Sequence, residues 1–219
     1  MTDGKITALE VQKRNKERVN VYIDGEFAFG LNMMDAAALR KGQILTPVEV
    51  TRLQHGDAVV KAVDAAANFL SYRPRSTTEV RRNLTKKYDP EVVEAAMQRL
   101  VDLNYLDDRA FARFWVENRI TFKPRSPMAL SLELRQKGVP DDIIREATAD
   151  VDVDEAAYQA AKKRLRRHRG GTFADFERKL GGFLQRRGFR YDTIREVLNR
   201  LQNELAETEP DFFAAEDTH

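Results

Sequence analysis

A five-residue motif recurs 50 positions along the chain. Residues 72–76 read Tyr-Arg-Pro-Arg-Ser and residues 122–126 read Phe-Lys-Pro-Arg-Ser, so that an aromatic residue and a base precede Pro-Arg-Ser twice. A further echo lies at residues 184–188, Leu-Gln-Arg-Arg-Gly, which match Leu-Arg-Gln-Lys-Gly at residues 134–138. A fixed period of this length is typical of tandem supersecondary units, each too small to bury its apolar face alone. The repeat therefore predicts an elongated, modular protein.

Helical signals fill each period. Apolar residues fall at helical spacing from about residue 58 onward, and helix starts are marked at Asp89-Pro90, Ser126-Pro127 and Thr172. Leu184 follows Thr172 by 12 residues, whereas Leu134 follows Ser126 by eight, so the third such helix should be about one turn longer. Each period accommodates three helices. The expected divisions are an N-terminal extension at residues 1–58, three-helix repeats at 59–106, 107–153 and 154–205, and an acidic tail at 206–219 that we expect to be disordered.

The first 50 residues have a different pattern. Short stretches rich in β-branched and aromatic residues lie at 6–12, 19–23 and 27–31, and Asp24-Gly25 between the last two is a strong hairpin signal. They predict a three-stranded antiparallel sheet. We expect a short helix over 34–41, another from Thr46-Pro47, and a helix end at His55-Gly56. The predicted fold is mainly α, with three tandem three-helix repeats forming an elongated curved rod and a small N-terminal antiparallel β-sheet.

Composition and charge narrow the class of protein. The chain has no cysteine, which excludes disulfides and thiolate metal sites, and it has no apolar run of membrane-spanning length. We expect a soluble cytoplasmic protein with no membrane contact. The net charge is +2, but the last 18 residues hold six acids and no base, so residues 1–201 carry +8. A basic body with an acidic tail is common in proteins that associate with nucleic acid.

An enzymatic site is not indicated. The three histidines have no partners at triad or metal spacing, and Asp150-x-Asp152-x-Asp154 lacks the later Gly and Glu of a calcium loop. We interpret that segment as an acidic linker that caps the next helix. No phosphate-cradling glycine loop is present. We expect no catalytic residue, no metal and no cofactor.

Basic clusters are the remaining functional signal. Residues 162–169 hold six bases and no acid, a density that favours an anionic partner, although single bases in a last helical turn also offset the helix dipole. No base-reading motif is evident, so any DNA binding should be phosphate-driven and salt-sensitive. The candidate binding residues are Arg73, Arg75, Lys86, Lys87, Lys123, Arg125, Arg135, Lys137, Lys162, Lys163, Arg166, Arg167, Arg186 and Arg187.

Two aromatic groups have different interpretations. Phe111, Phe114 and Trp115, with the later Phe122, are expected to form the apolar face of one helix. Phe212-Phe213 lies among acids, and could dock on the protein's own basic face, contact a partner, or belong to a disordered tail.

The repeats together resemble the RecX family, regulators of the RecA recombinase. The resemblance is carried by residues 69–80 (Phe-Leu-Ser-Tyr-Arg-Pro-Arg-Ser-Thr-Thr-Glu-Val), 103–112 (Leu-Asn-Tyr-Leu-Asp-Asp-Arg-Ala-Phe-Ala) and 133–140 (Glu-Leu-Arg-Gln-Lys-Gly-Val-Pro). It covers roughly residues 59–205, and the N-terminal hairpin is similar to an extension found in some members. One departure is Tyr88, which stands where the other repeats have Gly138 and Gly188.

The resemblance implies a non-enzymatic, monomeric modulator. Members lie along the groove of RecA–DNA filaments and lower ATPase, strand-exchange and coprotease activities, which would affect DNA repair and the SOS response. Single- and double-stranded DNA would be bound weakly and without sequence preference. Two other classes stay open: a general DNA-binding protein that only competes for DNA, and a helical scaffold whose basic run serves an acidic protein partner.

Overall fold

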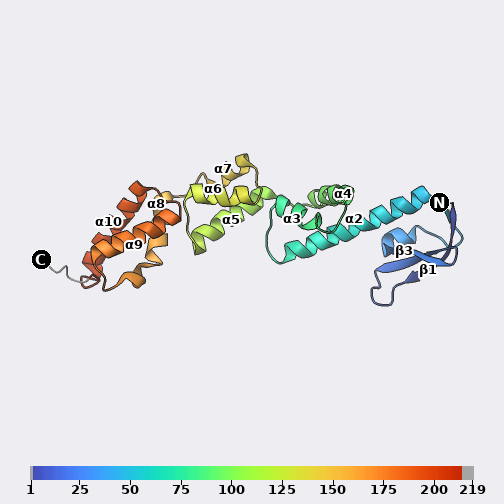
Figure 1. Ribbon diagram of the computed structural model, residues 1–219, viewed down its shortest axis with the longest axis horizontal. Helices are drawn as coiled ribbons and strands as arrows, with labels where there is room; N and C mark the ends of the chain where they lie inside the picture. Colours follow the sequence, from blue (N-terminus) through green and yellow to red (C-terminus); the bar gives the residue numbers. More distant parts are fainter. Residues whose placement is uncertain (1, 214–219) are drawn as a thin grey trace. The chain divides into compact units, whose positions relative to one another are not determined.

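The computed structural model describes residues 2–213 and divides into two compact units. The first unit holds Met1–Arg75 and Glu79–Leu106, and the second holds Ser76–Thr78 and Asp107–His219. Both units are mainly helical, and the first also carries an antiparallel sheet (Figure 1). The predicted fold class, three three-helix groups with a small N-terminal sheet, is confirmed.

The sheet has four strands in the order β3-β2-β1-β4. β1 (Gly4–Val11), β2 (Arg18–Ile23) and β3 (Glu26–Asn32) are the three predicted strands, and the Asp-Gly turn joins the last two with positive φ at both Asp24 (51°) and Gly25 (92°). The fourth strand, β4 (Ile44–Leu45), pairs with the start of β1 and was not predicted. Two residues are too short a run to show a strand pattern in the sequence.

The helices after the sheet have other limits than those predicted. α1 (Met33–Ala37) ends before the expected residue 41, and α2 runs unbroken over Pro47–Ser71, through the helix end expected at Gly56 and the division expected at residue 58. Its start is as predicted: the Thr46 hydroxyl accepts from the Glu49 amide and the Glu49 carboxylate accepts from the Thr46 amide. One glycine inside a helix costs only about 1 kcal/mol, which the packing of α2 on both sides outweighs.

That packing places α2 in two cores of the first unit. Val50 and Leu53 contact the sheet core around Val21 and Leu31. Further along, α2 joins α3 (Thr77–Leu84) and α4 (Pro90–Asp102) in the first three-helix core. The residues buried in that core are Val59, Ala62, Val63, Ala66, Val80, Leu84, Val92, Val93, Ala96, Met97 and Leu100.

The second unit contains two further three-helix groups (Figure 1). One consists of α5 (Asp108–Phe122), α6 (Pro127–Gln136) and α7 (Asp141–Thr148). The other consists of α8 (Val153–Lys162), the 3₁₀ turn η1 (Leu165–His168), α9 (Phe173–Arg186) and α10 (Tyr191–Thr208). α9 has 14 residues against 10 in α6, as the spacing predicts.

The repeated motif forms the joints of the second unit. The Ser126 amide donates to the Arg187 carbonyl (3.1 Å), and its hydroxyl caps α6 at the Ala129 amide (3.2 Å). One period earlier, the Ser76 hydroxyl donates to the Lys137 carbonyl (2.5 Å) and the Thr78 hydroxyl to the Gly138 carbonyl (3.1 Å). The Pro-Arg-Ser segment that ends at Ser76 therefore contacts Lys137-Gly138, and the one that ends at Ser126 contacts Arg187.

Some aromatic residues lie elsewhere than the sequence predicts. Phe111 is buried, but Phe114 is 42% exposed and Phe122 is 68% exposed, because the buried face of α5 continues through Val116 instead. In the tail, α10 continues to Thr208, Phe212 is 2% exposed, and the Phe213 ring packs on Phe173 and Phe176. Residues 206–213 are thus folded against the third group, whereas the sequence predicts disorder from residue 206. The rest of the acidic tail lies outside the described residues.

No helix among residues 2–213 is both long and apolar enough to cross a membrane.

Candidate functional site

Several of the predicted binding bases contact other residues of the same chain. Arg73 pairs with Glu79 (2.9 Å) and Arg135 with Asp141 (2.7 Å). The Arg75 guanidinium lies 3.5 Å from the centre of the Phe69 ring and its Nε donates to the Phe69 carbonyl (3.0 Å). Burial, and then the neighbouring Arg73, holds the pKa of Arg75 below its ordinary value. Arg73 and Arg75 tie the loop between α2 and α3 to those helices, whereas Arg135 joins α6 to α7. Carboxylates offset the charges of Arg73 and Arg135.

Arg125 and Lys137 also contact other side chains of the protein. Nε of Arg125 lies 2.9 Å from a Glu133 oxygen, although their angle falls outside that of a hydrogen bond. Glu133 also accepts from Arg119 Nε and from the Trp115 indole, both at 2.7 Å. The Lys137 ammonium lies 4.4 Å from the centre of the Trp115 ring. The Glu133 carboxylate thus accepts two hydrogen bonds and pairs with Arg125 beside a half-buried tryptophan.

Lys162 belongs to a polar cluster at the end of α8. Its ammonium donates to the Tyr158 hydroxyl (3.1 Å), which in turn donates to Glu204 (2.7 Å). The hydrogen bond to Tyr158 raises the pKa of Lys162, while the Tyr158 hydroxyl lowers the pKa of Glu204. This arrangement ties α8 to α10, so Lys162 has a structural partner.

The remaining bases are open to solvent. Among the described residues, six predicted bases make no side-chain hydrogen bond or ion pair with the rest of the protein, and all six are exposed: Lys86, Lys87, Lys123, Arg166, Arg167 and Arg186. Lys86 and Lys87 follow α3, and Arg186 is the last residue of α9, so two of the three groups carry open bases where their second helix ends. These residues retain a full charge for an external anion.

The basic run at residues 162–169 does not form a continuous α-helix. α8 ends at Lys162, and Leu165–His168 form the single 3₁₀ turn η1. Repulsion among neighbouring cations disfavours a longer helix here. The turn is held from outside: the Gly170 amide donates to the Phe212 carbonyl (2.9 Å) and Arg169 pairs with Glu209. The shortened helix directs Lys163, Arg164 and Arg167 toward one cavity, which they line together with Lys123 and Arg187.

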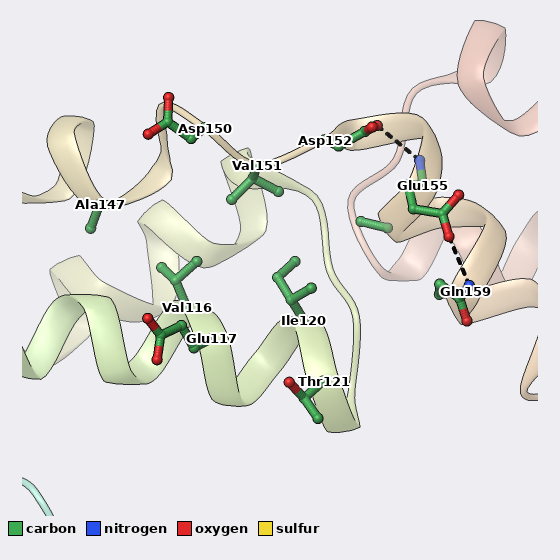
Figure 2. A pocket seen from close by; sticks show the side chains of 11 residues that line it. Val116, Glu117, Ile120, Thr121, Ala147, Asp150, Val151, Asp152, Glu155 and Gln159 are labelled. Atoms are coloured by element: carbon green, nitrogen blue, oxygen red, sulfur yellow. Dashed lines mark hydrogen bonds between the residues drawn. The ribbon is translucent and has the colours of Figure 1, made fainter.

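A second cavity of the same unit has the opposite character (Figure 2). Its volume is about 380 Å³, and α5 supplies Val116 and Ile120 to its apolar floor. Acids stand around it: Glu117, Asp150, Asp152 and Glu155. The acidic linker also caps α8, as predicted, since Asp152 accepts from the Asp154 and Glu155 amides at 3.1 and 3.0 Å. Acids of this density repel phosphate, so the cavity is not a nucleic-acid site.

Residues that sequence reasoning did not single out are Arg164, Phe122 as an exposed ring, and Phe183. Arg164 belongs to the conspicuous basic run, which was the available signal. Within the described part of the chain, no group of three or more histidine, aspartate or glutamate residues is arranged to hold a metal ion.

Comparison with known proteins gives matches over nearly the whole chain. Four family models match in order: the regulatory protein RecX N-terminal domain at residues 4–46, and the first, second and third three-helix domains of RecX at 62–100, 107–147 and 151–198. The regulatory protein RecX of Bacillus subtilis (strain 168) is 34% identical over 205 residues, covering 91% of this chain and 78% of that protein. The protein of the same name from Lactobacillus johnsonii is 34% identical over 217 residues, covering 96% and 79%.

Solved structures show the same similarity. The crystal structure of a regulatory protein RecX aligns with a TM-score of 0.71 at 27% identity, covering 90% of this chain and 99% of that one. The crystal structure of RecX from Lactobacillus salivarius aligns with a TM-score of 0.58 at 25% identity, over 68% of this chain and 99% of that one.

Proposed function

The chain belongs to the RecX family of regulatory proteins, and we propose that it regulates the RecA recombinase by binding in the groove of the RecA–DNA filament. Bound there, it lowers the recombinase, ATPase and coprotease activities of RecA, and so modulates DNA repair and the SOS response. It acts as a monomer, in the cytoplasm where RecA and DNA are found, and without catalysis of its own.

The observation that carries this proposal is the set of open bases repeated along the helical groups. Lys86 and Lys87 lie in the first unit, whereas Lys123, Arg166 and Arg186 lie in the second, and none is neutralised by an acid of the described chain. A filament is a periodic partner that presents DNA phosphates and protein acids at intervals. Several weak, repeated contacts to such a partner add up because the first contact raises the effective concentration of the others.

A sequence-independent DNA-binding protein is the second candidate function. It is favoured by the same open bases, since phosphate contacts alone support such binding without any base-reading element. The two candidate functions predict opposite effects of RecA on the affinity of this protein for DNA. A filament regulator gains affinity when RecA covers the DNA, whereas a DNA competitor loses its sites.

Cosedimentation tests the proposal directly. RecA filaments are assembled on single-stranded DNA with a slowly hydrolysed ATP analogue, and binding of the full chain to them is compared with binding to naked DNA. We expect tighter binding to the filament. We also expect Lys123→Glu combined with Arg186→Glu to weaken filament binding about tenfold, because reversed charges meet anionic surfaces.

The matched control is Arg145→Glu combined with Arg195→Glu, which changes the net charge equally at two other exposed arginines of the second unit. Its filament affinity should stay within about twofold of the unaltered protein. Equal affinity for filament and naked DNA would favour the DNA competitor, and binding to neither would favour a scaffold for another acidic protein.

A further inference from the structure

A small cationic cavity lies where the two helical groups of the second unit meet. Its volume is about 180 Å³, and five bases line it: Lys123, Lys163, Arg164, Arg167 and Arg187. They come from three separate segments, namely the loop after α5, the stretch that follows α8 and includes η1, and the residue that follows α9. No acid is among the lining residues.

Three of these bases, Lys163, Arg164 and Arg187, have partners in the protein, and those partners are uncharged. The Lys163 ammonium donates to the Thr121 carbonyl, and Arg187 Nη1 donates to the Pro124 carbonyl (3.1 Å). The guanidinium carbons of Arg164 and Arg187 lie 4.3 and 4.9 Å from the centre of one ring, that of Phe183. Carbonyls and rings orient a cation without cancelling its charge. This differs from Arg73 and Arg135, which carboxylates neutralise.

The acid nearest in effect to this cavity, Glu133, already pairs with other groups. Glu133 is the acid whose charge acts on Arg187, and it is shared by Arg119, Arg125 and the Trp115 indole. Burial, followed by the charges of Arg125, Arg164 and Arg119, lowers the pKa of Arg187. The protein therefore holds several cations close together against their mutual repulsion, and an anion in the cavity would relieve that repulsion.

The size of the cavity and the aromatic residue beside it indicate the kind of anion. Pockets for whole small molecules usually have about 300–1,000 Å³, so a cavity of about 180 Å³ is better suited to a single phosphate group. Phe122 also lines the cavity and is 68% exposed, so its ring is accessible to a ligand that enters the cavity. Aromatic rings next to cationic grooves are the platforms on which unpaired nucleic-acid bases stack.

We propose that this cavity binds a backbone phosphate of single-stranded nucleic acid, with a neighbouring base stacked on Phe122. Lys123 and Arg167, which have no partner among the described residues, contact the phosphate from two different segments, while Arg164 and Arg187 supply further positive charge. The site deepens the proposed function and rests on it for its biological use, since it gives the regulator a DNA contact inside the filament. The phosphate contact itself requires no RecA.

The test measures binding of a labelled short oligothymidine to the full chain by fluorescence anisotropy, without RecA, over a range of salt concentrations. We expect Lys123→Gln combined with Arg167→Gln to weaken binding about tenfold. The salt dependence should also become shallower, by about 0.7 in slope for each phosphate that the variant no longer neutralises. Both side chains are exposed and unpaired, so thermal unfolding should be unchanged.

Arg145→Gln combined with Arg195→Gln is the control, because it removes the same net charge from exposed positions outside the cavity. It should change the affinity by no more than about twofold. Equal losses in both double variants, or no loss in the cavity variant, would overturn the site in favour of diffuse attraction by the whole surface.

A second arm separates nucleic acid from free phosphate. Phe122→Ala should weaken oligothymidine binding several-fold. Tripolyphosphate has no base, so its affinity for this variant should equal its affinity for the unaltered protein. Unchanged oligothymidine affinity in Phe122→Ala would overturn the stacking and leave an oligophosphate site. No oligothymidine binding at low salt would overturn the site altogether and direct attention to acidic proteins.

The outcome is separable from that of the proposed function. If the unaltered chain binds oligothymidine through this cavity but does not bind RecA filaments, only the filament proposal fails. If it binds filaments but the cavity variant retains full oligothymidine affinity, only the cavity proposal fails.

Discussion

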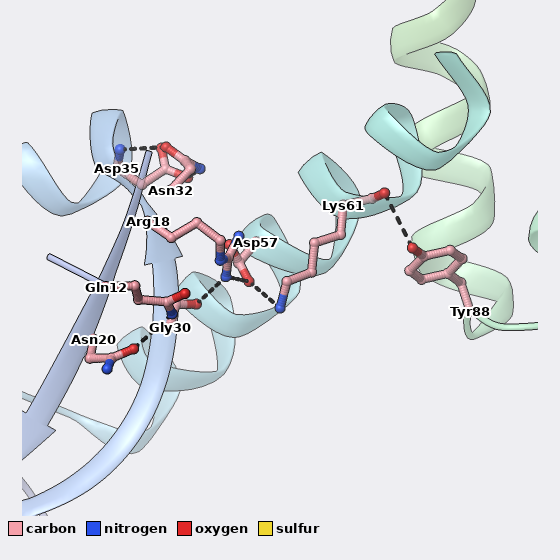
Figure 3. A network of polar contacts seen from close by, with 9 residues as sticks. All are labelled: Gln12, Arg18, Asn20, Gly30, Asn32, Asp35, Asp57, Lys61 and Tyr88. Atoms are coloured by element: carbon pink, nitrogen blue, oxygen red, sulfur yellow. Dashed lines mark hydrogen bonds and ion pairs between the residues drawn. The ribbon is translucent and has the colours of Figure 1, made fainter. Parts of the chain in front are cut away.

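At the scale of single residues, Asp57 connects the sheet to α2. Its side chain is buried, at 3% exposure, and one carboxylate oxygen accepts from Arg18 and from Lys61, each at 2.8 Å (Figure 3). Arg18 also donates to the Gly30 carbonyl, so the pair fixes β2, β3 and α2 together. Loss of the carboxylate would leave a largely buried guanidinium without its counterion, which is more costly than loss of an exposed pair.

The pKa of Asp57 gives this interaction a pH dependence. Burial alone raises the pKa, but hydrogen bonds from Arg18 and Lys61 outweigh it, so the pKa lies below its ordinary value. The unfolded chain, with a carboxyl pKa of about 3.9, therefore takes up its proton first as the pH falls. The stabilisation is complete above that value and is lost as the pH falls through the lower pKa of the folded protein.

We predict that Asp57→Asn lowers the free energy of unfolding by about 2 kcal/mol at neutral pH, because it removes hydrogen bonds to a charged group. Urea unfolding at a series of pH values measures this. The gap between the two proteins should narrow below about pH 4. A gap that does not change with pH would show that the ion pair is not the cause. Lys61→Ala is the control, since its ammonium is half exposed and its pair should contribute no more than about 1 kcal/mol.

The individual roles of the bases were the least predictable part of the site. The sequence shows that Arg75 and Arg125 follow a repeated aromatic residue, but not that one stacks on Phe69 and the other faces Glu133. Such partners come from other turns and helices, and a side chain of several rotatable bonds reaches whichever is nearest. By contrast, Lys86, Lys87 and Arg186 lie where helices end and are exposed, so they stay candidates for contact with an anion.

At the scale of elements, the repeated glycine is as important as the repeated serine. Gly188 follows α9 with a φ of +88°, and a Cβ there would lie 2.5 Å from the Ser126 hydroxyl and 2.9 Å from the Ala129 Cβ. Gly138 has the same backbone form and approaches Thr78 equally closely. The motif therefore recurs because a left-handed helix end and a close contact to the preceding serine segment are both needed at each joint.

We predict that Gly188→Ala lowers the free energy of unfolding by at least about 3 kcal/mol, from backbone strain and overpacking together. Gly170→Ala provides the matched comparison: its φ is +78°, but nothing lies within 4 Å of the added Cβ. That variant should cost only the strain, about 1 kcal/mol. Thermal and urea unfolding of both variants measure the difference. Equal costs would mean that the joint tolerates the methyl group and that close contact is not its basis.

Sequence patterns predicted which helices and strands exist better than they predicted the residues at which those elements end. The hairpin at Asp24-Gly25, the helix start at Thr46 and the long third-group helix all follow from local chemistry that the structure retains. The continuity of α2 through Gly56 does not, because it depends on packing against both the sheet and α4. Phe213 is similar: local acidity predicts disorder, whereas its ring packs on Phe173 and Phe176 far away in the sequence.

At the scale of the whole molecule, opposite charges are sorted into different places. The cavity lined by Val116 and Ile120 is surrounded by acids, whereas the cavity beside Phe122 is lined by five bases, and both use the last turn of α5. Open bases also lie in the first unit, after α3. This distribution, together with membership of the RecX family, supports a regulator whose partner is anionic and extended. Its binding should weaken steeply as salt is added.

The most direct test is the DNA-dependent ATPase of RecA on single-stranded DNA, measured with this protein at far below one copy per RecA. A filament regulator predicts a large loss of ATPase at that ratio, because one bound molecule affects the growth or stability of a filament of many protomers. An ATPase that stays unchanged until the protein is abundant enough to cover the DNA would contradict the account and leave a simple DNA competitor.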